Sequence, residues 1–167
     1  MSNIILVGMP GAGKSTVGVV LAKKLGYRFL DSDLVIQERE GKLLHQLISE
    51  LGGDGFLQLE NEINASICTD RSVIATGGSA VYGKEAMEHF RQIGTVIYLS
   101  LPCDEIARRL GDLNERGVVL APGQTLSDLY RERVPLYETY AHRTIDCSGK
   151  SIREIVEEIT EECGRAG

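Results

Sequence analysis

Short apolar runs alternate with longer stretches of helical periodicity along this 167-residue chain. A short apolar run is typical of a buried strand, and apolar residues spaced three or four positions apart are typical of an amphipathic helix. The predicted strands cover residues 4–7, 27–30, 72–75, 96–99 and 143–146. The predicted helices cover residues 17–25, a broken region up to about 68, 83–92, 104–110, 125–140 and the segment from 152 onward. Strands that alternate with helices in this way predict an α/β fold, with a parallel sheet covered on both faces.

Glycine and proline mark where several of these elements end or bend. Gly26 follows the first helical pattern at the position of a C-cap, and Gly41 and residues 52–55 (GGDG) should break the second helical region. Pro135 should bend the helix that contains it. Residues from about 111 to 124 show little periodicity and form a long connection for a compact domain. Such loops often close over active sites, so we expect a mobile lid there.

The composition is that of an ordinary globular domain, with 43% hydrophobic and 25% charged residues. The length suits one domain, so residues 1–167 are expected to form a single, monomeric unit. A formal net charge of −6 provides no basic field for a nucleic-acid backbone or an anionic membrane, and neither partner is expected. No signal peptide or membrane-length apolar run is visible, which favours a cytoplasmic location.

Residues 8–15 read GMPGAGKS and match the phosphate-binding pattern GxxxxGK[ST], between a predicted strand and a predicted helix. The backbone N–H groups of such a loop converge on a polyphosphate at the helix N-terminus, and its glycines let the phosphates approach the backbone. Lys14 can reach the β- and γ-phosphates of a nucleotide, and the Ser15 hydroxyl can bind the accompanying Mg²⁺. A chance glycine-rich turn is the alternative, and the flanking strand and helix disfavour it.

Four further charged residues supply what phosphoryl transfer requires, namely a bound metal, positive charge and an oriented acceptor. Asp31 ends the second strand, where α/β sheets bind ligands, and could hold Mg²⁺ through water. Asp33 could accept a proton from the hydroxyl that is phosphorylated, or orient that hydroxyl. Arg116 is the only basic residue of the predicted lid and could reach the transferring phosphate. Arg133 lies on the apolar stripe of its helix, where a guanidinium needs an anionic partner.

Each of these residues also has a purely structural interpretation. Asp31 and Asp33 could cap the helix that follows them, and Arg116 could be a solvated loop residue. Arg133 could bind substrate or form half of a structural ion pair, and the residues alone leave both possibilities open. Arg131 is displaced from Arg133 by about 200° of helical rotation and does not share the inward stripe.

With these motifs in place, the chain resembles the shikimate kinases, which belong to the nucleoside-monophosphate-kinase-like group of P-loop proteins. The resemblance covers nearly the full length and rests on motifs in the order and spacing of that family. The motifs are the P-loop GMPGAGKS, the Asp31-Ser32-Asp33 triplet, the Thr76-Gly77-Gly78-Ser79 turn, the arginine-bearing lid and the RVPLY run of Arg133 to Tyr137.

The resemblance implies a three-layer fold with a five-stranded parallel sheet, and transfer of the ATP γ-phosphate to a ring hydroxyl of shikimate with Mg²⁺, a step of amino-acid biosynthesis. Residues 33–68 would form the acceptor-binding region, and Lys14, Asp33 and Arg116 would be the catalytic residues. The acceptor would be held by Asp33, Leu57, Gly77, Gly78 and Arg133. ATP would be held by Gly11, Ala12, Gly13, Lys14, Ser15, Thr16, Arg109 and Arg116. Arg109 would pack against adenine, although an arginine at a helix C-terminus is also favoured by the helix dipole alone.

The sequence departs from the family pattern on the acceptor side. Shikimate kinases normally read Phe-Arg-x-x-Glu where residues 56–60 read FLQLE, and that arginine helps to bind the substrate carboxylate. Leu57 cannot make this charge-assisted bond, whose loss typically weakens binding by about 1.5–3 kcal/mol. Ser79 replaces the third glycine of the turn, and residues 116–119 read RGVV where Arg-Pro-Leu is usual. These departures leave the ATP side intact and put the identity of the acceptor in question.

The first hypothesis is therefore an ATP- and Mg²⁺-dependent kinase of a hydroxyl on a small metabolite, with shikimate as the best single candidate. A close variant would take another small hydroxylated acid or amino acid, such as homoserine. A hypothesis of a different class is a nucleotide-binding regulatory module without acceptor chemistry. The presence of Asp31, Asp33, Arg116 and Arg133 together argues against the regulatory module, because a sensor of ATP needs no acceptor-side groups.

Overall fold

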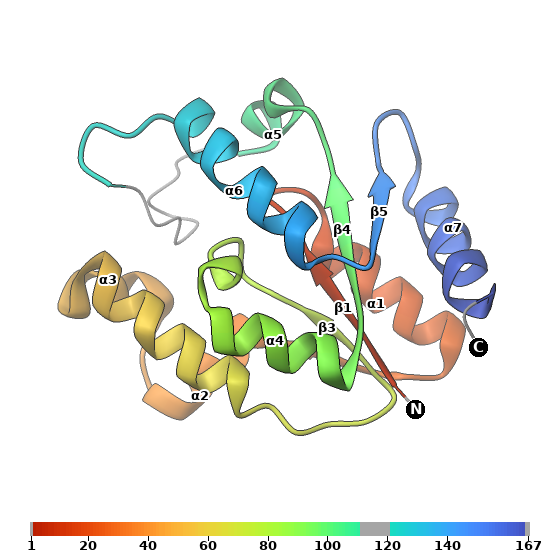
Figure 1. Ribbon diagram of the computed structural model, residues 1–167, viewed down its shortest axis with the longest axis horizontal. Helices are drawn as coiled ribbons and strands as arrows, with labels where there is room; N and C mark the ends of the chain where they lie inside the picture. Colours follow the sequence, from red (N-terminus) through yellow and green to blue (C-terminus); the bar gives the residue numbers. More distant parts are fainter. Residues whose placement is uncertain (1, 111–120, 166–167) are drawn as a thin grey trace.

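The computed structural model describes residues 2–110 and 121–165, and Figure 1 shows a sheet with helices on both of its sides. The five strands of the described part of the chain are all parallel, in the order β2-β3-β1-β4-β5. They are β1 Asn3–Val7, β2 Arg28–Asp31, β3 Ser72–Ala75, β4 Gly94–Ser100 and β5 Arg143–Asp146. The predicted α/β fold with a five-stranded parallel sheet is confirmed.

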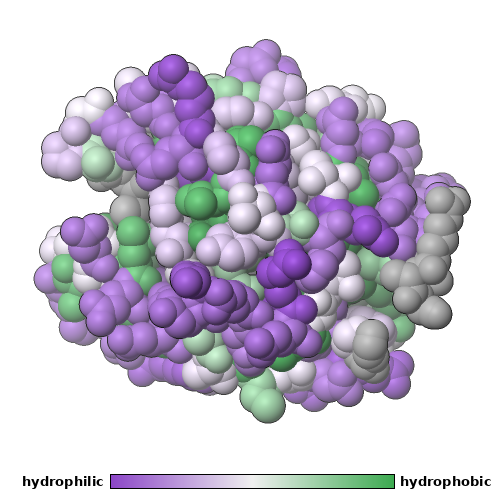
Figure 2. Space-filling view, in the orientation of Figure 1, coloured by the Kyte–Doolittle hydropathy of each residue, from purple (hydrophilic) through white to green (hydrophobic). Residues whose placement is uncertain are grey.

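The helices form a layer on each side of the sheet. They are α1 Lys14–Leu25, α2 Ser32–Glu40, α3 Leu44–Ala65, α4 Lys84–Ile93, α5 Cys103–Arg109, α6 Leu126–Tyr140 and α7 Ile152–Arg165, with a short 3₁₀ helix, η1, at Ala80–Tyr82. In Figure 1, α4 and α6 lie on one side of the sheet and α1 and α7 lie on the other. Helices α2 and α3 extend beyond the sheet next to α4, and the surface is hollowed between α3 and the start of α6 (Figure 2).

The core lies where the two helical layers meet the central strands. Strand β1 is buried along its whole length, as is β3, because helices cover both faces of the sheet. Ile5 and Leu6 of β1 and Ile74 of β3 have no exposed surface. This burial explains why these strands read as continuous apolar runs instead of alternating patterns.

Some predicted boundaries differ from the observed ones. Helix α1 begins at Lys14, within the P-loop motif, because Gly13 takes a left-handed conformation with φ 94° and caps the helix there. Gly41 ends α2 as expected. Gly52, with φ 75° and ψ 170°, interrupts α3 with a kink between two helical segments, so the predicted break at residues 52–55 is confirmed at Gly52. Helix α6 is continuous across Pro135, and the sequence pattern missed η1.

The predicted lid falls largely outside the described residues, since 111–120 and with them Arg116 are not part of the description. Its final segment is described, and there the Gln124 N–H donates to the Ala121 carbonyl at 3.0 Å. Among the described helices, none is both long and apolar enough to cross a lipid bilayer.

Candidate active site

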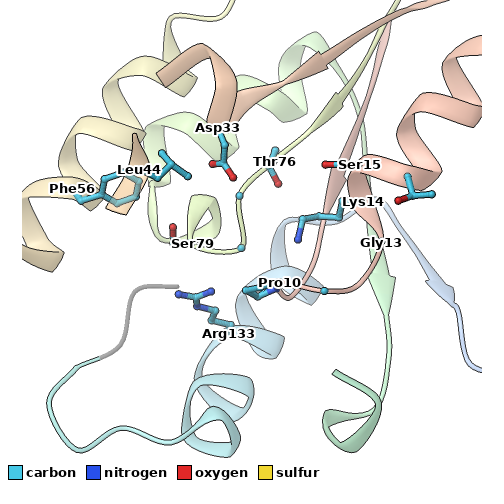
Figure 3. A pocket seen from close by; sticks show the side chains of 14 residues that line it. Pro10, Gly13, Lys14, Ser15, Asp33, Leu44, Phe56, Thr76, Ser79 and Arg133 are labelled. Atoms are coloured by element: carbon cyan, nitrogen blue, oxygen red, sulfur yellow. The ribbon is translucent and has the colours of Figure 1, made fainter. Parts of the chain in front are cut away.

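The carboxyl ends of three neighbouring strands carry the predicted site. Because β3 lies between β1 and β2, the P-loop after β1, Asp31 at the end of β2 and the turn after β3 meet at one edge of the sheet. A cavity of about 260 Å³ opens at this edge (Figure 3). It is lined by Pro10, Gly11, Gly13, Lys14, Ser15, Thr16, Asp33, Leu44, Phe56, Thr76, Gly77, Gly78, Ser79 and Arg133. The cavity therefore joins the predicted phosphate loop to most of the predicted acceptor residues.

Lys14 lies at the centre of the P-loop side of the cavity. Its ammonium group donates to the carbonyls of Gly8 at 2.6 Å and Met9 at 2.9 Å, so the loop's own backbone holds the side chain. Burial lowers the pKa of Lys14 from 10.5 to about 8, while the nearby Asp33 carboxylate acts in the opposite direction. A polyphosphate bound in the loop would stabilise the charged ammonium further. Ala12 also belongs to the loop, but it is buried and is not among the residues that line the cavity.

Asp31 caps the helix that follows it and also faces the P-loop serine. Its Oδ1 accepts the backbone N–H of Asp33 at 2.9 Å and so caps α2. Its Oδ2 faces the Ser15 hydroxyl, which donates to it over 3.4 Å. Two oxygen ligands side by side, next to a phosphate loop, suit Mg²⁺, which takes few protein ligands and keeps several waters.

Asp33 projects from the start of α2 into the cavity, opposite Lys14 (Figure 3). Burial and, to a smaller extent, the neighbouring Asp31 raise the pKa of its carboxyl from 3.8 to about 6, against the lowering effect of Lys14. A carboxylate with a pKa just below neutrality can accept a proton from a substrate hydroxyl and release it again. Asp33 is therefore suited to the role of general base.

The two glycines of the turn after β3 are required by the close approach of their neighbours. A Cβ atom on Gly77 would come within 2.5 Å of Asp33 Oδ1. A Cβ atom on Gly78 would lie 2.7 Å from Pro10 Cδ and 2.9 Å from Arg133 Nη1. The Tyr137 hydroxyl holds this turn by donating to the Gly78 carbonyl at 2.6 Å. The bare backbone therefore lets the P-loop, Asp33 and Arg133 face one space.

Arg133 enters the cavity from α6, with only 1% of its surface exposed (Figure 3). Its guanidinium carbon lies 5.3 Å from the centre of the Tyr82 ring, and its Nε donates to the Tyr82 hydroxyl at 3.3 Å. Arg131 is exposed and pairs with Asp128 at 3.0 Å. The helical spacing thus separated the inward arginine from the outward one correctly.

Glu60 is a site residue that the sequence analysis did not single out. It is 2% exposed, and its Oε1 accepts the Ser79 hydroxyl at 2.7 Å. Its Oε2 lies 3.1 Å from the position of a Cβ on Gly77, on the same side as Asp33. Burial raises the pKa of Glu60 from 4.5 to about 8, against the lowering effect of the Ser79 hydrogen bond. The sequence signal that could have identified Glu60 was its position in the FLQLE segment. That segment does not reveal that the Glu60 side chain is buried.

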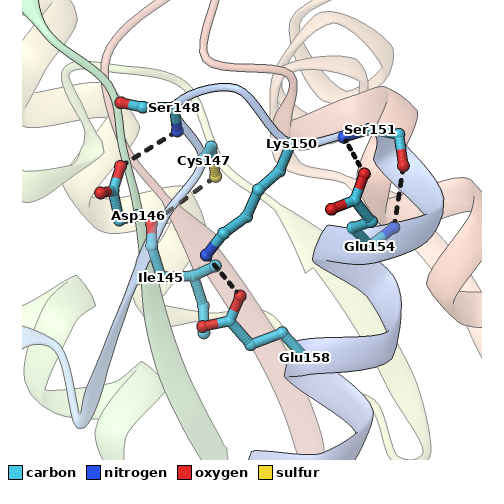
Figure 4. A network of polar contacts seen from close by, with 8 residues as sticks. All are labelled: Ile145, Asp146, Cys147, Ser148, Lys150, Ser151, Glu154 and Glu158. Carbon is cyan, nitrogen blue, oxygen red and sulfur yellow. Dashed lines mark hydrogen bonds and ion pairs between the residues drawn. The ribbon is translucent and has the colours of Figure 1, made fainter.

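A second cavity, of about 400 Å³, lies on the far side of the P-loop, between α5 and the loop that follows β5. Arg109 lines it, donates from Nη1 to the Gly11 carbonyl at 3.3 Å and pairs through Nε with Glu105 at 3.1 Å. The loop after β5 is held by its own contacts (Figure 4): Asp146 accepts the Ser148 N–H at 3.0 Å, and Lys150 pairs with Glu158 at 2.7 Å. Arg109 therefore connects the P-loop to this cavity.

Two predicted residues remain, and only one of them, Leu57, belongs to the described part of the chain. Leu57 lines a third cavity, of about 540 Å³, together with Tyr82, Pro122 and Glu132. Arg116 is outside the described residues. The apolar wall of the main cavity is formed instead by Phe56, which precedes Leu57 in the same helix, and by Leu44.

Comparison with known proteins agrees with this geometry. A model of the shikimate kinase family matches residues 10–164. The shikimate kinase of Chlorobium chlorochromatii is 34% identical over 175 residues, spanning 98% of this chain and 92% of that protein. The shikimate kinase of Persephonella marina is 37% identical over 160 residues, spanning 95% and 97% respectively. A structure of shikimate kinase from Acinetobacter baumannii in complex with shikimate has a TM-score of 0.89 and 34% identity, covering 99% of this chain and 94% of that one. The chain therefore belongs to the shikimate kinase family.

Proposed function

We propose that this protein transfers the γ-phosphate of ATP to a ring hydroxyl of shikimate. The observation that carries the proposal is a single cavity that holds a buried P-loop lysine, a half-buried carboxylate and a buried arginine, contributed by Lys14, Asp33 and Arg133. A phosphate donor, a hydroxyl and a carboxylate are the three groups that such a set would bind. The relative from Acinetobacter baumannii, whose structure was solved with shikimate, supports this acceptor over homoserine.

The reaction needs no covalent intermediate with the protein, because phosphoryl transfer depends on positioning and on charge. The P-loop amides and Lys14 would bind the β- and γ-phosphates, and Arg133 would neutralise the carboxylate of the acceptor. Asp33 would orient the acceptor hydroxyl and take its proton as the bond to phosphorus forms. Phe56 and Leu44 line the same cavity and would pack against the carbon ring.

Mg²⁺ bound with ATP would be held by the Ser15 hydroxyl and, through water, by Asp31, and it would neutralise charge on the β- and γ-phosphates. Adenine would occupy the cavity beside Arg109, whose contact with Gly11 keeps the guanidinium next to the P-loop. Arg116 would approach the phosphates from the lid at about 111–124. A single domain, a monomeric state and a cytoplasmic location complete the proposal.

Turnover with a panel of acceptors tests the proposal. Purified protein with ATP and Mg²⁺ should release ADP with shikimate and not with homoserine. Lys14→Ala should abolish this turnover, and Asp33→Asn should reduce kcat by about 10²–10⁴-fold, the usual contribution of a general base. Asp33→Asn should still bind ATP, which separates the two halves of the site. Turnover with homoserine but not with shikimate would mean that homoserine is the acceptor. The absence of turnover with every acceptor would favour the regulatory module.

A further inference from the structure

Tyr82 stands between the main cavity and the third cavity, which Leu57 lines. It is the last residue of η1 and packs its ring against the guanidinium of Arg133. The centre of the ring lies 5.3 Å from the guanidinium carbon. Its other neighbours in the third cavity include Leu57 and Glu132. Figure 2 shows the surface hollowed in this region, between α3 and the start of α6. Tyr82 therefore touches the arginine of the acceptor site without lining the main cavity itself.

The hydroxyl of Tyr82 joins two charged side chains of α6. It accepts from Arg133 Nε at 3.3 Å and donates to Glu132 Oε1 at 2.5 Å. Since a hydroxyl has one proton, its donation to Glu132 leaves its lone pairs to accept from Arg133, and the two bonds are compatible. Burial raises the pKa of Tyr82, so the hydroxyl keeps its proton at neutral pH. Hydrogen bonds to charged groups are the stronger kind, and Tyr82 makes two of them.

The contact continues from Glu132 toward the lid. Gln124 donates from Nε2 to Glu132 Oε2 at 3.1 Å, and its Oε1 accepts the backbone N–H of Ala121 at 3.0 Å. Both oxygens of the Glu132 carboxylate are therefore engaged, which fixes the group that holds Tyr82. A long arginine side chain loses much rotamer freedom when it binds an anion, so holding Arg133 in place beforehand strengthens binding.

We propose that Tyr82 is a positioning residue for Arg133 and thereby determines how tightly the site binds the carboxylate of its acceptor. Residue 57 is a leucine and offers no second cation, so recognition of that carboxylate depends on the orientation of Arg133. The choice of shikimate as the acceptor in the test rests on the proposed function. The contact between Tyr82 and Arg133 does not.

The first test compares Tyr82→Phe with Tyr130→Phe. Tyr82→Phe removes the hydroxyl and keeps the ring. Tyr130→Phe is the control, because it removes a tyrosine hydroxyl that donates to the Leu101 carbonyl. The KM for shikimate should rise about tenfold in Tyr82→Phe, with kcat and the KM for ATP within about twofold of wild type. With the methyl ester of shikimate, which lacks the carboxylate, Tyr82→Phe and wild type should be alike. An equal loss with acid and ester, or no loss in Tyr82→Phe, would overturn the proposal.

A second measurement does not depend on the acceptor. The Nε–H of Arg133, buried and bonded to Tyr82, should give a slowly exchanging NMR cross-peak that is assigned by its loss in Arg133→Lys. In Tyr82→Phe this cross-peak should shift and exchange faster, and in Tyr130→Phe it should not. An unchanged signal in Tyr82→Phe refutes the proposal, even if shikimate proves to be the wrong acceptor. Should Tyr82→Phe fail to fold, Glu132→Gln tests the same link. We expect a smaller rise in the KM for shikimate and the same change in the Arg133 cross-peak. If neither the KM nor the cross-peak changes, the proposal is wrong.

Discussion

Lys14, Asp33 and Glu60 form a set of neighbouring ionisable groups at the main cavity, and burial shifts the pKa of each one. Burial raises the pKa of Asp33 to about 6 and that of Glu60 to about 8, and it lowers that of Lys14 to about 8. These shifts favour an ionised Asp33, a protonated Glu60 and a charged Lys14 near pH 7. Of the two carboxyl groups, only Asp33 is then charged, beside the cations of Lys14 and Arg133, which costs less than burying two charged carboxylates. Asp33 is the carboxylate left available as a base.

This order predicts how activity depends on pH. We expect kcat/KM for shikimate to fall below about pH 6, because protonated Asp33 can no longer accept the hydroxyl proton. Glu60→Gln is the matched control, since it removes the other carboxyl and leaves Asp33 in place. Its acid limb should keep the same midpoint, within the precision of a steady-state pH profile. An acid limb that vanishes in Glu60→Gln would assign the titration to Glu60 instead.

Stability should also depend on the protonation of Glu60. Its raised pKa means that the folded protein binds more protons than the unfolded chain between about pH 4.5 and 8. Across that window the Glu60 contribution to the free energy of unfolding is therefore present at the acid end and is lost as the pH rises. Urea unfolding should show a steeper fall between pH 5 and 8 for wild type than for Glu60→Gln. Equal slopes would mean that Glu60 is solvated.

Among the connections between secondary structure elements, the turn between β3 and η1 lies where the two proposed substrates would meet. Its backbone faces Asp33 at Gly77 and both Pro10 and Arg133 at Gly78. The last residue of the turn, Ser79, donates to Glu60 of α3. Because no side chain intervenes at residues 77 and 78, α2, α6 and the P-loop can approach one point from three directions. The turn therefore sets the distance between the phosphate side and the acceptor side.

Adding one methyl group to this turn should separate the two sides. In Gly77→Ala the new Cβ would lie 2.5 Å from Asp33 Oδ1, and the carboxylate would have to move away. We expect kcat with shikimate to fall by about 10²-fold or more, as for loss of a positioned base. The dissociation constant for ATP should stay within about threefold of wild type, because the hydrogen bonds of Lys14 and Ser15 go to the loop backbone and to Asp31, and not to Asp33. Calorimetry with ATP and a coupled assay for ADP measure the two quantities, and an equal loss in both would contradict this view of the turn.

The sequence predicted those elements whose pattern is dictated by burial on both sides. Strands β1 and β3 read as apolar runs because helices cover both of their faces, and Arg133 was assigned to the inner side of α6 by helical spacing alone. Helical spacing also groups Glu60 with Asn64, but it cannot say that this polar face of α3 turns inward, where both residues are buried. Nor can it find contacts across long stretches of chain, and Tyr82 lies 51 positions from Arg133.

At the scale of the whole molecule, the proposed function gives the sheet edge a nucleotide side and an acceptor side. The P-loop, α5 and the loop after β5 enclose the first, and α2, α3, η1 and α6 enclose the second. Two departures from the family pattern, Leu57 and Ser79, lie on the acceptor side. The structure shows a partner for Ser79, which hydrogen-bonds to Glu60, and places Leu57 in the third cavity next to Tyr82. Specificity can therefore change on one side without disturbing ATP binding on the other.

Restoring the family arginine tests this division. Leu57→Arg adds a cation close to Tyr82 and Arg133, and a charge-assisted bond to the acceptor carboxylate would lower the KM for shikimate by about tenfold or more. The control is Leu51→Arg, which adds the same charge to an exposed position on the same helix. Its KM should match wild type, and neither variant should change the KM for ATP. A raised KM in Leu57→Arg would mean that an arginine in the third cavity disturbs the contact between Tyr82 and Arg133 instead of adding a bond to the carboxylate.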